Sequence, residues 1–296
     1  MTVYTGVWPA LVTPSSTDQS INIPVLKKLV SYLIDKGVEG FYVGGTTGEG
    51  IFMPVADRKA LVEAVQAENN GRVPIIVHAG AVAAGDAVDL ARHARDHGAV
   101  GISSILPPLY NSSDSLQAYF ERLAGAVPDI AFMPYLLNPT INTVDLLKRL
   151  LHIPNLAGTK YTGPNLYEFR ALIDMGSADW TMFSGMDEQA VYALMMGATG
   201  NVGSTLNFMP GVYKAMQTAV SAGRFAEAQE LQIKANRVTT AMIAVGFNGA
   251  LKEVLSTILG ESCGDPRLPG LPLSDAARRT LHESLAQTDF DALVAM

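Results

Sequence analysis

The sequence predicts a single (β/α)8 barrel followed by extra helices. Eight short apolar segments alternate with helix-like segments in units of about 25–30 residues, and 296 residues suit such a barrel as one domain. The apolar segments are continuously hydrophobic, which is typical of parallel strands covered on both faces. No dinucleotide-binding motif or edge strand stands out, which disfavours the alternative of a doubly wound open sheet.

The expected strands share a short apolar run bounded by glycine, proline or polar residues. In order they are residues 6–14, 40–45, 73–80, 99–107, 130–137, 156–162, 180–185 and 200–205. The intervening segments have helical periodicity: Leu146, Leu147 and Leu150 recur on one face of a helix that starts at Asn142 or Thr143.

After residue 208 the strand signals stop. Residues 223–246 and 273–288 have helical patterns, and Ser274 is a good N-terminal cap for the second. The proline-rich stretch 263–273 links them. We therefore expect residues 1–222 to form the barrel and residues 223–296 a helical layer packed on it, within one structural domain.

Composition excludes several classes of protein. The net charge is −7 without a basic run, which argues against a nucleic-acid partner. No apolar stretch approaches the ~20 residues of a membrane span, and the N-terminus lacks the pattern of a signal peptide. Cys263 is the single cysteine, so no intrachain disulfide is possible. A cytoplasmic enzyme or binding protein is expected.

Two segments place unusual polar residues where barrel enzymes carry their chemistry, at the carboxyl ends of strands. Lys160 interrupts an apolar strand. As a structural residue, it would extend its side chain to the barrel mouth or pair with a carboxylate. As a functional residue, it would be an amine nucleophile that forms a Schiff base with a ketone. The stretch "FYVGGTTGEG" offers backbone N–H groups and the hydroxyls of Thr46 and Thr47 to a small acidic ligand. It lacks the Gly-Lys-Ser/Thr of a phosphate loop.

Other candidates are weaker by themselves. Tyr135 ends the fifth strand and could be a core aromatic. Asp187 and Glu188 follow the seventh strand and could be an acidic pair at a helix N-terminus. The histidines are scattered without metal-ligand spacing, and neither a Gly-x-Ser-x-Gly nor an HExxH motif occurs, so no metal is expected.

Three motifs at these separations, "GGTTGEG", "MPYLLNP" and "GTKYT", resemble the dihydrodipicolinate synthase/N-acetylneuraminate lyase family of pyruvate-dependent class I aldolases. The resemblance covers nearly the whole chain. It implies a TIM barrel with C-terminal helices, a homotetramer, and no metal or organic cofactor, because Lys160 itself forms a Schiff base with the substrate. It also implies that the Thr46–Thr47 loop holds the carboxylate of pyruvate.

Within the family, the chain is more similar to the lyases than to the synthases. Synthases carry an arginine five residues after the tyrosine, where this chain has Thr140. The segments "GTKYTGPNLYEFR", "SGMDEQ" and "GNVGSTLN" resemble the lyase pattern. Two departures are Thr46, where lyases have serine, and a proline that comes one place late after Tyr135.

The resemblance implies cleavage of N-acetylneuraminate, or of a related 2-keto-3-deoxy sugar acid, to pyruvate and an aldose. It makes Lys160, Tyr135 and Thr47 catalytic, with Thr162 positioning the tyrosine. It implies that four residues bind the sugar, namely Gly185, Asp187, Glu188 and Ser204. It also implies that Tyr110 lies near the site and completes the pocket of a neighbouring subunit. A dihydrodipicolinate synthase, a 2-keto-3-deoxygluconate-type aldolase, and a barrel that binds a keto acid without turnover are the alternatives.

Overall fold

The computed structural model describes residues 2–108, 112–137, 140–177 and 179–296. Eight parallel strands form one sheet in the order β1-β8-β7-β6-β5-β4-β3-β2. Their bounds are β1 Gly6–Pro9, β2 Phe41–Val43, β3 Ile75–His78, β4 Gly101–Ile105, β5 Ala131–Leu137, β6 Gly158–Thr162, β7 Thr181–Ser184 and β8 Gly200–Gly203.

The two end strands of this sheet also meet. Ala10 and Tyr42 form a parallel bridge, and the Leu11 N–H donates to the Tyr42 carbonyl at 2.9 Å. This contact joins β1 to β2 and closes the barrel. The expected (β/α)8 fold is therefore confirmed, with a strand at each of the eight expected positions.

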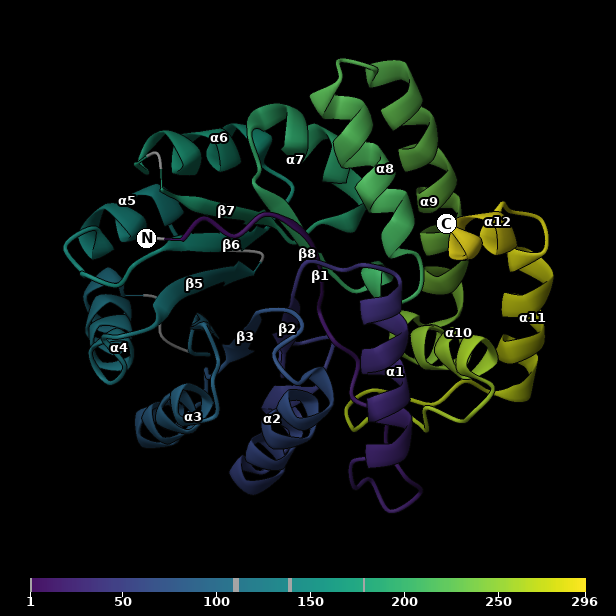
Figure 1. The fold of residues 1–296 in the computed structure, drawn as a ribbon, viewed down its shortest axis with the longest axis horizontal. Helices are drawn as coiled ribbons and strands as arrows, with labels where there is room; N and C mark the ends of the chain where they lie inside the picture. The colour runs from purple at the N-terminus through teal and green to yellow at the C-terminus, as the bar shows by residue number, and fades with distance from the viewer. Residues whose placement is uncertain (1, 109–111, 138–139, 178) are drawn as a thin grey trace.

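A helix follows each strand and lies on the outside of the barrel (Figure 1). These helices are α1 Ile23–Asp35, α2 Val55–Asn69, α3 Ala84–Asp96, α4 Ser113–Gly125, α5 Thr143–Leu150, α6 Leu166–Asp174, α7 Ala190–Met196 and α8 Pro210–Ser221. Single turns of 3-10 helix occur at Gly50–Phe52, Asp187–Gln189 and Thr205–Asn207.

Four more helices complete the chain. They are α9 Phe225–Val245, α10 Phe247–Leu259, α11 Asp275–Leu285 and α12 Phe290–Ala295. Figure 1 shows α9 beside α8, with α10 to α12 gathered on the same side of the barrel. In the described part of the chain no single helix is long and apolar enough to cross a membrane; α9 and α10, bent by 116° at their junction, meet that criterion only together.

The barrel has two hydrophobic cores, and they explain the uninterrupted apolar strands. Alternate side chains face the barrel interior, where Trp8, Tyr42, Met133 and Phe183 pack together. Their neighbours along each strand, such as Val7, face the helices and belong to the larger core. A strand covered on both faces needs no polar alternation.

Two predicted helix starts are confirmed by their caps. The side chain of Asn142 accepts from the Asp145 N–H at 2.9 Å, and the Ser274 hydroxyl oxygen accepts from the Ala277 N–H at 3.2 Å. Both contacts satisfy a backbone donor that the first helical turn leaves unpaired. Helix α10, in contrast, was not among the predicted elements.

Candidate active site

Lys160 is the third residue of β6, and its side chain is only 3% exposed. In the sheet it stands between Tyr135 of β5 and Phe183 of β7. Its Nζ lies 4.1 Å from the centroid of the Tyr135 ring and 4.4 Å from that of Tyr42. Among the described residues, no carboxylate lies within salt-bridge distance of this nitrogen. The lysine side chain is therefore shielded from solvent, and no ion pair with a described residue accounts for its burial.

The loop after β2 brings its hydroxyls to the same end of the barrel. Thr46 Oγ1 lies 3.4 Å from the Tyr135 hydroxyl, and Thr47 Oγ1 lies 2.7 Å from the Ser204 hydroxyl that follows β8. Thr46 is thus the direct neighbour of the Tyr135 hydroxyl, and Thr47 contacts Ser204. The loop folds back on itself so tightly that a Cβ at Gly50 would lie 2.0 Å from the Gly44 carbonyl oxygen. Only glycine fits there.

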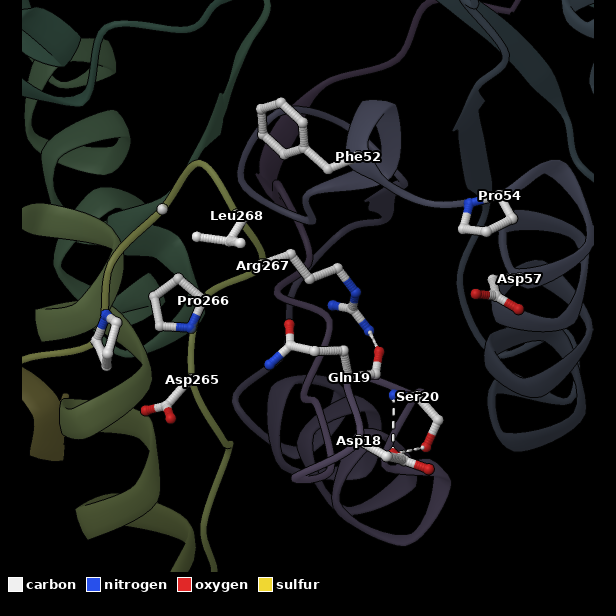
Figure 2. A pocket seen from close by; sticks show the side chains of 12 residues that line it. Asp18, Gln19, Ser20, Phe52, Pro54, Asp57, Asp265, Pro266, Arg267 and Leu268 are labelled. Carbon is white, nitrogen blue, oxygen red and sulfur yellow. Dashed lines mark hydrogen bonds between the residues drawn. The ribbon is translucent and has the colours of Figure 1, made fainter.

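Glu49, in the same loop, is held in a buried ion cluster that the sequence analysis missed. Its Oε2 accepts from Lys252 Nζ and from the Arg267 guanidinium, both at 3.0 Å, and its Oε1 accepts from the Arg267 backbone N–H at 2.9 Å. Arg267 also donates to the Gln19 carbonyl, as Figure 2 shows. Residues of the C-terminal segment thus hold the loop after β2 in place through Glu49. A surface pocket of about 680 Å³ borders this cluster and contains none of the predicted site residues.

Thr162, two residues after Lys160 on β6, and Gly185, just after β7, lie close to Lys160. A Cβ at Gly185 would lie 1.8 Å from Thr162 Oγ1 and 2.9 Å from Lys160 Cε, so glycine is required for space. The Gly185 N–H is already used, since it donates to the Tyr161 carbonyl at 2.8 Å. The Thr162 hydroxyl is buried and has no partner among the described residues. It is available to a substrate.

Asp187 is a buried acid with one free oxygen. Its Oδ2 accepts from the backbone N–H and the hydroxyl of Thr205, both at 2.8 Å, while its Oδ1 has no partner in the described structure. Burial, and secondly the nearby Glu188 carboxylate, raise the pKa of Asp187 to about 6. A Cβ at Gly203 would lie 1.5 Å from Oδ1. An acid that only capped a helix at the surface would be exposed to solvent and would not have a raised pKa.

Helix α9 holds the turn that carries these two acids. Gln232 donates to the Asp187 carbonyl and Asn236 to the Glu188 carbonyl, both at 3.0 Å. Glu188 itself is partly exposed. The appended helices therefore position two of the expected sugar ligands.

Most of the predicted residues are brought together at one end of the barrel. Tyr110 lies outside the described residues, as does the late proline after Tyr135. Besides Glu49, sequence reasoning missed Tyr42, whose ring faces Lys160. Its place in the strand just before the glycine-rich loop was the signal that could have found it.

One pair of histidines does lie close together in the structure. His93 and His97 are four residues apart at the end of α3, and their rings stack at 3.9 Å. Their nitrogens and a carboxylate oxygen of Glu63 lie within 4.8 Å of one another, on the outer helices and away from the barrel interior. This cluster could hold a metal ion.

Comparisons with known proteins agree with the residue pattern. The family model described as the dihydrodipicolinate synthetase family matches residues 3–288. N-acetylneuraminate lyase of Danio rerio is 34% identical over 279 residues, covering 90% of this chain and 91% of that protein. The enzyme of the same name from Rhizobium meliloti is 33% identical over 284 residues, covering 95% and 94%.

Solved structures of similar proteins have the same fold. The Proteus mirabilis N-acetylneuraminate lyase superposes with a TM-score of 0.92 at 29% identity, covering 97% of this chain and 99% of that one. A Bacillus anthracis dihydrodipicolinate synthase superposes with a TM-score of 0.89 at 28% identity, covering 97% and 99%. With a family model that spans nearly the whole chain and relatives above 30% identity, this chain belongs to the dihydrodipicolinate synthetase family.

Proposed function

We propose that the protein is a class I aldolase, a carbon–carbon lyase that cleaves N-acetylneuraminate or a related 2-keto-3-deoxy sugar acid to pyruvate and an aldose. The observation that carries this proposal is Lys160: a buried amine on a barrel strand, next to two tyrosine rings and without a carboxylate partner among the described residues. The relatives that carry the name N-acetylneuraminate lyase support the choice of substrate.

In the proposed reaction the unprotonated Lys160 amine attacks the C2 ketone of the open-chain sugar acid. Loss of water leaves an iminium. This cation accepts the electron pair of the C3–C4 bond when that bond breaks, which releases the aldose and leaves an enamine. Protonation at C3 and hydrolysis of the resulting iminium then release pyruvate and the free amine. The lysine supplies the electrophilic catalysis, so the step requires neither a metal nor an organic cofactor.

Tyr135 is the proposed proton carrier. Its phenol removes the proton of the C4 hydroxyl as the bond breaks, and it returns a proton during enamine protonation. A phenol with an ordinary pKa of about 10 needs a hydrogen-bond partner to act in this way. Thr46, 3.4 Å away, is the neighbouring hydroxyl, and the unpartnered Thr162 hydroxyl and the substrate carboxylate are the other candidates.

The sugar tail is proposed to lie over the ends of β7 and β8. There the free Oδ1 of Asp187, the carboxylate of Glu188 and the hydroxyl of Ser204 can receive or donate hydrogen bonds. Gly185 contributes space rather than a donor. A homotetramer and a cytoplasmic location remain further parts of this proposal.

The second candidate is dihydrodipicolinate synthase, which the similarity to the Bacillus anthracis enzyme favours. A synthase of that type uses an arginine after the tyrosine, and Thr140 stands there instead. The next arginine along the chain, Arg149, lies on α5 and pairs with Asp114 and Asp145 at the surface. An unpaired substrate carboxylate in a closed site is costly, which disfavours this reading.

A substrate panel tests the proposal. Pyruvate release is measured from N-acetylneuraminate and from 2-keto-3-deoxygluconate, and condensation of pyruvate with aspartate semialdehyde is measured alongside. We expect release from the first and little condensation. Efficient condensation without any release would establish the synthase instead.

The covalent step is tested separately. Borohydride added with pyruvate should trap an adduct on Lys160 and inactivate the enzyme, and Lys160→Ala should abolish both adduct and turnover. An adduct that maps to a different lysine would overturn the assignment. Absence of any adduct, with tight binding of the keto acid, would favour a binding protein.

A further inference from the structure

A potential metal site lies on the outside of the barrel, where α2 packs against α3 (Figure 1). Glu63 projects from the middle of α2, and His93 and His97 lie one helical turn apart at the end of α3. Residues four apart on a helix are neighbours on one face. The three side chains therefore converge from two helices, with no residue of the proposed active site among them.

The donor atoms are spaced as metal ligands. Glu63 Oε1 lies 2.8 Å from His93 Nε2 and 3.9 Å from His97 Nε2. In a tetrahedral zinc site with bonds of about 2.0–2.1 Å, neighbouring ligand atoms are about 3.3 Å apart. The observed distances lie on either side of that value. Small side-chain rotations would bring all three atoms to bonding distance of one ion.

The tautomer of His97 is already the one that a metal requires. Its Nδ1 lies 2.8 Å from the backbone carbonyl oxygen of His93. Because a carbonyl only accepts, Nδ1 carries the hydrogen and Nε2 keeps its lone pair. This Nε2 has no hydrogen-bond partner in the described part of the chain. Metal-binding histidines are commonly oriented by such a bond from the other ring nitrogen.

His93 anchors the cluster. Its side chain is only 12% exposed, and its ring stacks on that of His97 with an angle of 25° between the planes. Its Nδ1 is buried without a partner among the described residues, and its Nε2 lies 2.8 Å from a carboxylate oxygen of Glu63. Because a carboxylate only accepts, Nε2 donates its hydrogen to Glu63 in the metal-free protein, and a bound cation would take the place of that hydrogen on Nε2.

We propose that Glu63, His93 and His97 bind a divalent transition metal ion of the zinc type, with water in the remaining position. Two imidazoles and one carboxylate suit Zn²⁺, whereas Mg²⁺ and Ca²⁺ prefer ligand sets made of oxygen alone. A bound ion would link α2 to α3 and stabilise the folded state. The site is independent of the proposed aldolase reaction.

Zinc titration of the chelator-treated protein tests the site. Calorimetry should show one Zn²⁺ per chain, with no comparable binding of Mg²⁺, and Zn²⁺ should raise the melting temperature. The substitutions Glu63→Gln and His97→Ala remove exposed ligands and should each weaken Zn²⁺ binding by about tenfold to a hundredfold or more, judged from the loss when metal-supporting groups are removed. Both variants should melt as the parent does in chelator, which shows that they fold.

His152 and Glu121 provide the matched control. They form a surface pair at 3.0 Å, and no third ligand joins them among the described residues, so His152→Ala should leave Zn²⁺ binding unchanged. Pyruvate release should be the same with and without Zn²⁺, because the cluster is outside the barrel. Absence of stoichiometric binding, or equal affinity in the parent and in both ligand variants, would overturn the proposal and reduce the cluster to a surface ion pair.

Discussion

At the scale of single residues, Lys160 is surrounded by aromatic faces rather than by acids. The rings of Tyr42 and Tyr135 both lie within 4.5 Å of its nitrogen, at 4.4 and 4.1 Å. An aromatic face attracts a cation, and this attraction grows when water is excluded. It would act on the iminium as it acts on the ammonium form. The two tyrosines therefore favour the charged intermediate without an acid that would permanently neutralise it.

The substitution Tyr135→Phe distinguishes the role of the aromatic ring from the role of the hydroxyl as a proton carrier. The phenylalanine keeps the aromatic face toward Lys160 but removes the hydroxyl. We expect kcat for sugar cleavage to fall by about 10²–10⁴, the usual range for a lost general acid or base, while the borohydride-trapped pyruvate adduct still forms. Steady-state kinetics and mass spectrometry measure the two effects. Unchanged turnover would return Tyr135 to the role of a core aromatic.

The raised pKa of Asp187 predicts that the stability of the folded protein falls as the pH rises toward neutrality. Its pKa is about 6 in the folded state against an ordinary value of 3.8, so the folded state holds this proton more tightly than the unfolded chain does. Its contribution to stability is therefore full below about pH 4 and is lost as the pH rises toward and through 6. A shift of about 2 units corresponds to about 3 kcal/mol.

Asp187→Asn removes this titration while it keeps an acceptor for Thr205. At pH 7 the variant should be more stable than the parent by up to about 3 kcal/mol, and the difference should shrink as the pH falls below 6. Denaturant unfolding at several pH values measures this. Sugar cleavage should weaken in the variant, while adduct formation with pyruvate continues. A stability difference that does not change with pH would contradict the buried-acid interpretation.

At the scale of elements, the loop after β2 that carries Thr46 and Thr47 is held by a segment that follows more than 200 residues later. Glu49 accepts from both Lys252 and Arg267 in a buried cluster. Burial lowers the pKa of Lys252, and the Glu49 carboxylate opposes this effect. The C-terminal helices are thus structural supports of the site as well as a cover for the barrel.

Glu49→Gln should destabilise the protein and impair pyruvate binding together. Removing one partner of a buried ion pair leaves an uncompensated charge and costs about 3–5 kcal/mol. Denaturant unfolding measures the first effect, and the concentration of pyruvate needed for half-maximal borohydride inactivation measures the second. Glu261→Gln, which breaks the exposed pair with Lys28, is the control and should cost at most about 1 kcal/mol. Equal effects of the two substitutions would show that the buried cluster has no special role.

At the scale of the whole molecule, an apolar face lies near the barrel mouth. The loops after β2, β3 and β4 line a hollow of about 520 Å³ with mostly apolar residues. Val82 on its rim is 81% exposed, and Ile51 and Phe52 are each 44% exposed. Contiguous apolar surface of this kind commonly marks a protein interface. It supports the proposed homotetramer, with a second copy of the chain as the partner.

Val82→Glu tests this face. We expect light scattering to give four times the 31.5 kDa chain mass for the parent and a smaller assembly for the variant, because a charge buried at an apolar interface is costly. Leu271→Glu is the control, since Leu271 is also exposed, at 71%, but does not line this hollow. A monomeric parent protein would contradict the proposed assembly.

The sequence by itself determined the barrel and indicated Lys160 as the candidate nucleophile. Continuous apolar strands and regular helix starts arise from local physics, so the eight strands and the caps at Asn142 and Ser274 could be read directly. Lys160 could be found for the same reason, because a lysine inside an apolar strand conflicts with its surroundings. Thr46 stood out by its place in the glycine-rich loop after a strand, whereas Tyr135 was singled out as catalytic only by the family resemblance.

Only the tertiary structure decided which groups act as partners. Glu49 with Arg267, Thr47 with Ser204, and Glu63 with His97 are far apart in the chain, and nothing in the local pattern connects them. Their pairing depends on barrel closure and on the way the C-terminal helices pack, which bring distant side chains to within hydrogen-bonding or ion-pair distance. The raised pKa of Asp187 has the same origin, because burial and the nearness of other charges are properties of the folded chain.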